Sequence, residues 1–132
     1  PIRDLNGLRN LKNLKFLGLY NLRKLESLKG IEELLNLEAL EVNGCRSLMS
    51  IEAIKNLTHL RKLELCNDGD IPSLKPLVSL TKLESLFFYE STNIMDGDLS
   101  PLTQLPHLSK VSFQNRKHYS FMREDFQTLV LC

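Results

Sequence analysis

One apolar pattern recurs along nearly the whole chain and constrains the fold more than any other feature of the sequence. It consists of a leucine, two intervening residues, a second apolar residue, one intervening residue and a third apolar residue. Its copies LKFLGL, LEALEV, LRKLEL, LESLFF and LSKVSF begin at Leu14, Leu37, Leu60, Leu83 and Leu108. The starts are 23, 23, 23 and 25 residues apart. A fixed period of this length indicates a repeat architecture, in which one structural unit is copied and stacked.

Within one unit, the apolar spacing fits neither a single strand nor a single helix. In LEALEVNGC the apolar residues are Leu37, Leu40, Val42 and Cys45, at intervals of three, two and three. A strand alternates every two residues and an amphipathic helix every 3.6. The interval of two predicts a short strand in which Leu40 and Val42 face inward and the residues beside them face outward.

Apolar residues three apart precede each predicted strand. This interval is typical of a 3₁₀ turn, in which residues i and i+3 eclipse. The next strand would then lie parallel to the last, about 4.8 Å away. A single unit cannot bury its apolar face, so stacking of neighbours must supply the core. The residue pairs are Leu8 and Leu11, Ile31 and Leu34, Ile54 and Leu57, Leu77 and Leu80, and Leu102 and Leu105.

The five copies resemble the leucine-rich repeat pattern L-x-x-L-x-L-x-x-N/C-x-x-L over roughly residues 5–116. The 23-residue period and the run GIEELLNLEALEV look most similar to the short repeats of internalins and related intracellular regulatory proteins. The resemblance implies an α/β solenoid with a curved parallel β-sheet on its concave face and 3₁₀, short helical or irregular segments on its convex face. We expect one domain over residues 1–132, with a partial repeat at 1–13, five strand-bearing repeats at 14–116 and a different segment at 117–132.

The turn after each strand leaves backbone groups that a small polar side chain can satisfy. In the family this position carries Asn or Cys. We expect Cys45, Asp68 and Ser91 to serve here, whereas Leu22 and Arg116 depart from the pattern and predict an irregular first and last repeat.

The two ends of the chain break the repeat. In HYSFMREDFQTLVLC, the residues Phe121, Phe126, Leu129 and Leu131 are candidates to cover the open end of the core. Terminal repeats of a solenoid need such a cap. The alternative is that this segment is a remnant or a cut domain edge. At the other end, the half-repeat PIRDLNGL leaves a sheet edge that could pair with another chain.

Composition indicates neither a nucleic-acid partner nor a membrane. The chain has 17 Lys and Arg against 16 Asp and Glu, for a net charge of +1. No run approaches the roughly 18 apolar residues of a membrane span. Its 3 cysteines lack the close spacing of a zinc site and favour a reducing compartment. We therefore predict the cytoplasm, while the internalin resemblance would favour the cell surface.

Four aromatic residues are predicted to face outward from the strands. They are Phe16, Tyr20, Phe87 and Tyr89. Exposed aromatics gathered on one surface are typical of an interface hot spot. The alternative is that neighbouring strands simply cover them.

Charged residues share the same predicted face and give it mixed sign. They are expected either to form weak cross-strand pairs on a solvated surface or to give polar specificity around the aromatics. We include four of them in the candidate partner-binding surface, namely Glu41, Lys62, Glu64 and Lys110.

Other motifs give little support to chemistry. Two DGD tripeptides, at residues 68–70 and 96–98, could supply calcium ligands together with Asn93, but they form no calcium loop, and turn chemistry is the favoured interpretation because Asp-Gly is a preferred turn pair. The run QNRKHYS could touch phosphate, but its basic residues are few. The histidines His59, His107 and His118 have no predicted nucleophile beside them. We expect no enzyme activity, cofactor or metal.

The sequence therefore predicts a protein–protein interaction module that binds a protein partner through its concave face. A structural or self-associating segment of a longer solenoid, or the recognition arm of a larger enzyme or regulatory protein, are the alternatives.

Overall fold

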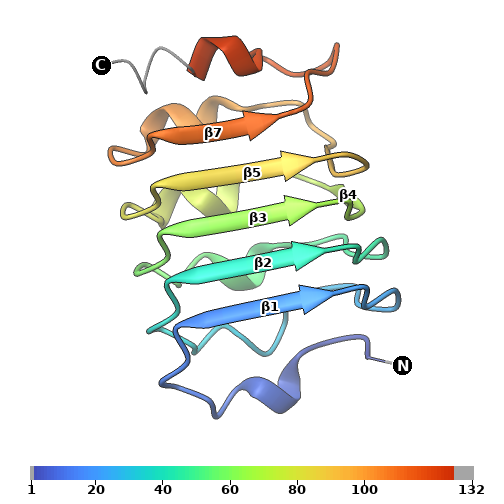
Figure 1. Ribbon diagram of the computed structural model, residues 1–132, viewed down its shortest axis with the longest axis vertical. Coiled ribbons are helices and arrows are strands. Elements are labelled where there is room, and N and C mark those ends of the chain that lie inside the picture. The colour runs from blue at the N-terminus through green and yellow to red at the C-terminus, as the bar shows by residue number, and fades with distance from the viewer. Residues whose placement is uncertain (1, 127–132) are drawn as a thin grey trace.

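Five parallel strands stack in chain order to form one sheet (Figure 1). This computed structural model describes residues 2–126. The register is continuous, because each strand begins opposite the start of the next, as Phe16 lies opposite Ala39. The strands of the sheet are β1 (Phe16–Tyr20), β2 (Ala39–Asn43), β3 (Lys62–Cys66), β5 (Ser85–Tyr89) and β7 (Lys110–Phe113).

The core lies behind this sheet and consists of columns of apolar side chains. Leu40, Leu63 and Leu86 occupy equivalent positions on adjacent strands and are fully buried. In the second inward column, Phe88 stacks on Phe113, with ring centroids 4.7 Å apart. Because alternate residues of each short strand face the core, the inward leucines of one unit pack on those of the next. Every unit therefore buries the apolar face of its neighbour.

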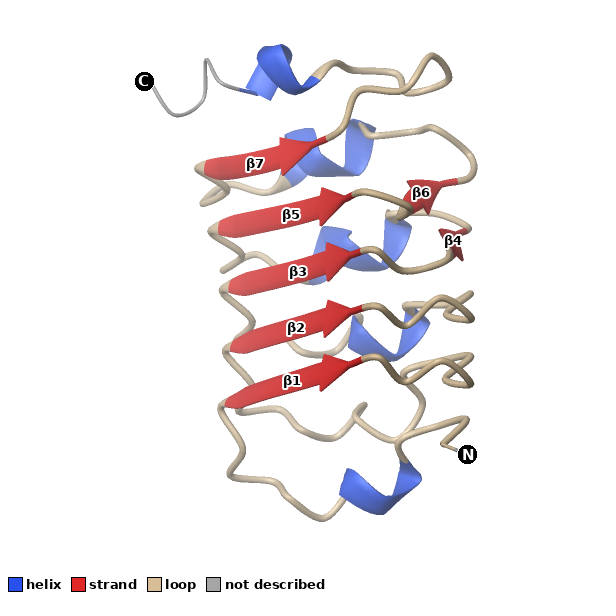
Figure 2. Ribbon diagram, turned by 45° about the vertical axis from the view of Figure 1, so that its right-hand side comes forward, coloured by secondary structure: helices blue, strands red, loops and turns tan. Residues whose placement is uncertain are grey.

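Short 3₁₀ turns and loops return the chain from the end of one strand to the start of the next. Figure 2 shows the later helical turns behind the sheet and the first one, near the N-terminus, below β1. Pro76 and Pro101 stand in the first turn of two of them, where a missing N–H costs little. The turns are η1 (Asn6–Leu8), η2 (Glu52–Ile54), η3 (Lys75–Ser79) and η4 (Ser100–Gln104).

A second, two-stranded parallel sheet joins the loops that follow β3 and β5. It consists of β4 (Asp70–Ile71) and β6 (Asn93–Ile94). The apolar period of the sequence predicts no strand at either of these places. The parallel main sheet and the short helical turns together fit a leucine-rich-repeat-like solenoid. No helix in the described part of the chain has the length and apolar character needed to cross a lipid bilayer.

The turns that follow the strands share one backbone conformation. The residue after β1, β2, β3 and β5 has a positive φ, between 56° and 76°. The residues in question are Asn21, Gly44, Asn67 and Glu90.

Side chains from the next position satisfy backbone groups at these turns. The Oγ of Ser91 donates to the carbonyl oxygen of Asp68 at 2.8 Å, and the Sγ of Cys45 lies 3.9 Å from that of Leu19. Arg116, which sequence reasoning treated as a departure from the pattern, donates from Nη2 to the carbonyl oxygen of Glu90 at 2.7 Å. A long cationic side chain here performs the task of a short polar one, because it reaches back across one repeat.

The segment after β7 covers the end of the core with aromatic rings. Phe126 is buried and packs edge-on against Phe113, with ring centroids 6.0 Å apart. Tyr119, which sequence reasoning did not single out, is also buried, and its hydroxyl accepts a hydrogen bond from the Ile94 amide at 3.1 Å. Phe121 is half-buried beside Phe126. Leu129 and Leu131, the other predicted cap residues, lie outside the described residues.

Candidate interaction surface

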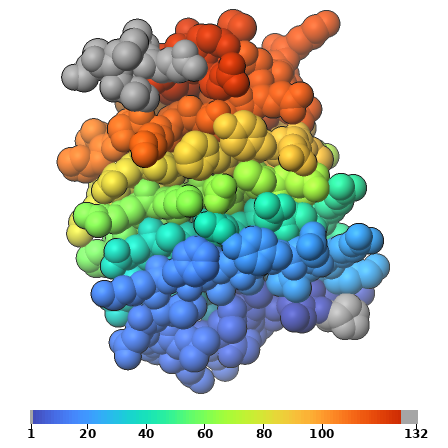
Figure 3. All heavy atoms as spheres, viewed as in Figure 1, coloured from blue at the N-terminus to red at the C-terminus, as the bar shows by residue number. Residues whose placement is uncertain are grey.

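The outward side of the main sheet, opposite the core, presents three rows of side chains. We call it the open sheet face. Its side chains form a continuous surface from β1 (blue) to β7 (orange) in Figure 3. Alternation along the strands determines which residues belong to it, and the register sets their order across it. The predicted site residues on this face are Phe16, Tyr20, Glu41, Lys62, Glu64, Phe87, Tyr89 and Lys110.

The two aromatics of β1 are the most exposed rings on this face. Phe16 and Tyr20 are each 51% exposed. The ring of Tyr20 lies back over Gly18, where an added Cβ would come within 2.6 Å of it. Its hydroxyl donates a hydrogen bond to Glu41 on the next strand. This bond lowers the pKa of Glu41 and raises that of Tyr20, because it favours the carboxylate and the protonated phenol.

The aromatics of β5 are more covered. Phe87 and Tyr89 both lie on the open sheet face but are only partly exposed. Their rings are nearly parallel, with centroids 6.3 Å apart and an interplanar angle of 9°. The Tyr89 hydroxyl donates a hydrogen bond to the Ser112 hydroxyl on β7. The two rings therefore pack against each other along β5, and both remain partly exposed.

Charged residues separate the two aromatic pairs. The Nζ of Lys62 lies 3.4 Å from Glu41 and 3.7 Å from Glu64, so one lysine bridges two carboxylates. Together with the Tyr20 hydroxyl, these contacts form a polar network across β1, β2 and β3. Lys110, at the start of β7, is exposed and forms no ion pair within residues 2–126.

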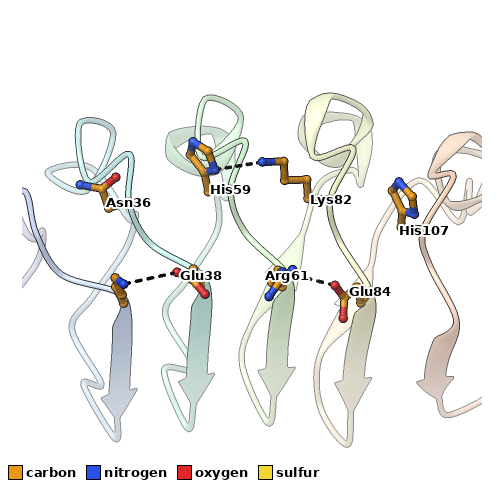
Figure 4. A pocket seen from close by; sticks show the side chains of 8 residues that line it. Asn36, Glu38, His59, Arg61, Lys82, Glu84 and His107 are labelled. Atoms are coloured by element: carbon orange, nitrogen blue, oxygen red, sulfur yellow. Dashed lines mark hydrogen bonds and ion pairs between the residues drawn. The ribbon is translucent and has the colours of Figure 1, made fainter.

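A groove of about 710 Å³ crosses the strands at their N-terminal ends (Figure 4). We call it the edge groove. Sequence reasoning missed it and assigned His59 and His107 no chemical role. The signal was present, because each lining residue directly precedes or follows the leucine that begins a copy of the repeated pattern. The lining residues are Lys15, Asn36, Glu38, His59, Arg61, Lys82, Glu84 and His107.

The acidic tripeptides serve local structure. Asp68 is 1% exposed, and its Oδ1 accepts a hydrogen bond from the Cys45 amide at 2.9 Å, so this carboxyl points into the protein. Asp98 accepts a hydrogen bond at 2.9 Å from the amide of Ser100, the first residue of η4. Asp70 instead lies within β4. Across residues 2–126, the structure places no group of three His, Cys, Asp or Glu side chains where they could hold a metal ion.

The cysteine on the open sheet face, Cys66, has a thiol of low nucleophilic reactivity. Cys66 is half-buried at the end of β3. Burial, reinforced by the nearby charge of Glu64, raises the pKa of its thiol to about 11. The thiol form therefore predominates near neutral pH, and the thiolate is the nucleophilic form.

Comparison with solved structures identifies internalins from Listeria monocytogenes str. 4b F2365 as similar in fold. One is internalin InlF, with 24% sequence identity and a TM-score of 0.54 over 89% of this chain. Another is internalin C2, with 22% identity, a TM-score of 0.47 and the same coverage of this chain. The chain spans 47% of the InlF chain and 71% of the internalin C2 chain. The likeness to InlF supports a leucine-rich-repeat-like fold. No protein-family model and no curated protein matches the sequence.

Proposed function

We propose that the chain is a protein–protein interaction module that binds its partner through the open sheet face, which we take to be the concave face of the solenoid. One observation carries the proposal, namely that two aromatic pairs share this face and that Phe16 and Tyr20 are each 51% exposed. Exposed aromatic rings near the centre of a contact surface supply much of the binding energy in protein interfaces.

The architecture supports this role energetically. Each aromatic side chain projects from a strand that is hydrogen-bonded within the sheet, so its backbone is already ordered before binding. Binding through a rigid surface loses less conformational entropy than binding through a mobile loop. The network of Lys62 with Glu41 and Glu64 lies between the aromatic pairs and can provide polar selectivity around them.

The test compares capture of protein partners from the native host by the wild type and by two variants. Phe87→Ala and Phe16→Ala each remove one ring from the open sheet face. We expect each to lower recovery of a specific partner about tenfold or more, as for a hot-spot residue that contributes at least 1.4 kcal/mol. Val78→Ala is the matched control, because Val78 is an exposed apolar residue of η3, in a return segment and not in the main sheet.

Thermal unfolding separates loss of binding from loss of folding. We expect the three variants to melt within a few degrees of the wild type, because their side chains are partly or largely exposed. A large fall in melting temperature with unchanged capture of the partner would contradict the proposal. Equal loss of capture by Val78→Ala would also contradict it.

We also propose that the module itself is not an enzyme and that it acts in the cytoplasm, with the cell surface as the alternative compartment. The raised pKa of the Cys66 thiol supports a binding role for the open sheet face rather than a nucleophilic one.

Self-association is a second candidate function, favoured by the edge of the main sheet. Within residues 2–126, β1 pairs with β2 on one side and with no strand on the other. An open edge presents backbone groups that another strand can pair with. Sedimentation at increasing concentration tests this. A concentration-dependent increase in mass supports self-association, and a strict monomer contradicts it.

A further inference from the structure

We propose that the edge groove binds an extended acidic segment of a protein. The inference deepens the proposed function, since such a segment would belong to the partner held on the open sheet face. It concerns a different surface, however, and depends on a separate set of side chains at the N-terminal ends of the strands (Figure 4).

Lys15, Glu38, Arg61 and Glu84 form what we call the lower wall of the groove. Their charges cancel in two ion pairs. Lys15 lies 4.0 Å from Glu38, and Arg61 lies 3.3 Å from Glu84. These residues directly follow the first leucine of successive units and alternate in sign from one unit to the next. The lower wall therefore carries no net charge and can accept a ligand of either sign.

The upper wall carries an unbalanced positive charge. The Nζ of Lys82 lies 3.3 Å from the Nδ1 of His59, which accepts its hydrogen bond when the imidazole is neutral. Within residues 2–126, Lys82 forms no ion pair with a carboxylate. His107 occupies the next place along the same row (Figure 4). A lysine flanked by two imidazoles offers N–H donors to an anion, and such charge-assisted hydrogen bonds are stronger than neutral ones.

The size of the groove favours a chain segment over a small anion. Its volume is about 710 Å³, far more than one carboxylate or phosphate group occupies. From the unit of Lys15 to the unit of His107 it crosses four strand spacings of about 4.8 Å, or roughly 19 Å. An extended polypeptide covers about 3.3 Å per residue, so about six residues would span the groove. The occupant is therefore an extended peptide with at least one carboxylate near Lys82.

The test measures binding of a fluorescently labelled hexapeptide of glutamate by anisotropy at low salt, with a lysine hexapeptide as the control probe. We expect the acidic peptide to bind and the basic one not to bind. Lys82→Gln should weaken binding roughly fivefold, as for loss of a surface charge pair. Binding should also weaken in 0.5 M salt, because added ions screen the attraction.

Two matched variants complete the experiment. Lys24→Gln removes the same charge from an exposed lysine outside the groove and should leave binding unchanged. Equal weakening by Lys24→Gln and Lys82→Gln would overturn the proposal, because it would indicate attraction by overall charge. Binding of inorganic phosphate in the groove without binding of the acidic peptide would also overturn it.

Failure of this inference can be distinguished from failure of the proposed function. Phe87→Ala should leave peptide binding unchanged, since Phe87 lies on the open sheet face and does not line the groove. If the peptide does not bind while Phe87→Ala still reduces capture of the partner, only the inference about the groove is wrong.

Discussion

Asp68 places a carboxyl group in a buried turn, where a neutral side chain could also accept the hydrogen bond from the Cys45 amide. Its Oδ1 accepts a hydrogen bond from the Cys45 amide, while its Oδ2 is buried and has no hydrogen-bond partner among the described residues. Burial raises the pKa of this carboxyl from 3.8 to about 7, and the single bond to Cys45 offsets only part of that effect. The charged form is therefore unfavourable in the folded protein.

The first prediction concerns the pH dependence of stability. Above pH 7 the Asp68 carboxyl is ionised in both the folded and the unfolded states, and burial penalises the folded state. As the pH falls from 7 toward 4, the folded protein binds a proton before the unfolded chain does, so this group increases the free energy of unfolding. Asp68→Asn should remove this gain and should be more stable than the wild type at pH 8.

Urea denaturation at pH 8, 6 and 5 measures the effect. Asp70→Asn is the matched control, because Asp70 is an exposed aspartate in the same tripeptide and its substitution should change the free energy of unfolding far less than Asp68→Asn does. The interpretation is wrong if Asp68→Asn retains the pH dependence of the wild type.

At the scale of elements, the segment after β7 is joined to the preceding units by ring contacts and by several hydrogen bonds. The rings of Phe88 and Phe113 each meet Tyr119 edge-on, at centroid distances of 6.0 and 5.7 Å. The Tyr119 hydroxyl also satisfies the buried amide of Ile94 in β6. One side chain thus joins the C-terminal segment to both sheets.

The second prediction isolates this hydrogen bond. Tyr119→Phe keeps the ring but leaves the Ile94 amide without its partner, so we expect it to lower the free energy of unfolding by about 1–3 kcal/mol. Tyr89→Phe removes a hydroxyl from a partly exposed ring and should cost less, because water can replace the bond to Ser112. Denaturant unfolding of the two variants compares the costs. If both variants lose a similar free energy of unfolding, the buried hydrogen bond to Ile94 contributes no more than the bond to Ser112, and the prediction is wrong.

At the scale of the whole molecule, each inner strand of the main sheet is stabilised by a neighbour on either side. The inner strand β3 lies between β2 and β5, whereas β1 has a strand neighbour on one side only within the described part of the chain. The inward residue Leu63 of β3 is accordingly fully buried, while Leu17, which holds the equivalent position in β1, is only half-buried. Stability in such an array is approximately a sum over units and their interfaces.

The third prediction compares these two leucines. Leu63→Ala should lower the free energy of unfolding by about 2–5 kcal/mol, because it leaves a cavity between packed rows. Leu17→Ala should cost clearly less, since solvent already reaches that side chain. Denaturant unfolding measures both costs, and amide hydrogen exchange should be faster in β1 than in β3. Equal costs and equal exchange would contradict a nearest-neighbour description of the fold.

The sequence alone was sufficient to predict the parallel strands and the inward rows, because these depend on local alternation and on a period that repeats. Leu40 and Leu63 face the core for the same reason that Glu41 and Glu64 face outward, namely the two-residue alternation of a strand. The positions of the predicted aromatic residues on the open sheet face follow from the same rule.

The tertiary structure alone decided the contacts between units. His59, Lys82 and His107 are separated by 23 and 25 residues in the chain, and parallel stacking turns each of these intervals into one step across the sheet. The same stacking brought Tyr119 to the Ile94 amide. Such contacts depend on side-chain direction and on which polar groups remain unpaired after stacking, and neither property is encoded in the apolar period itself.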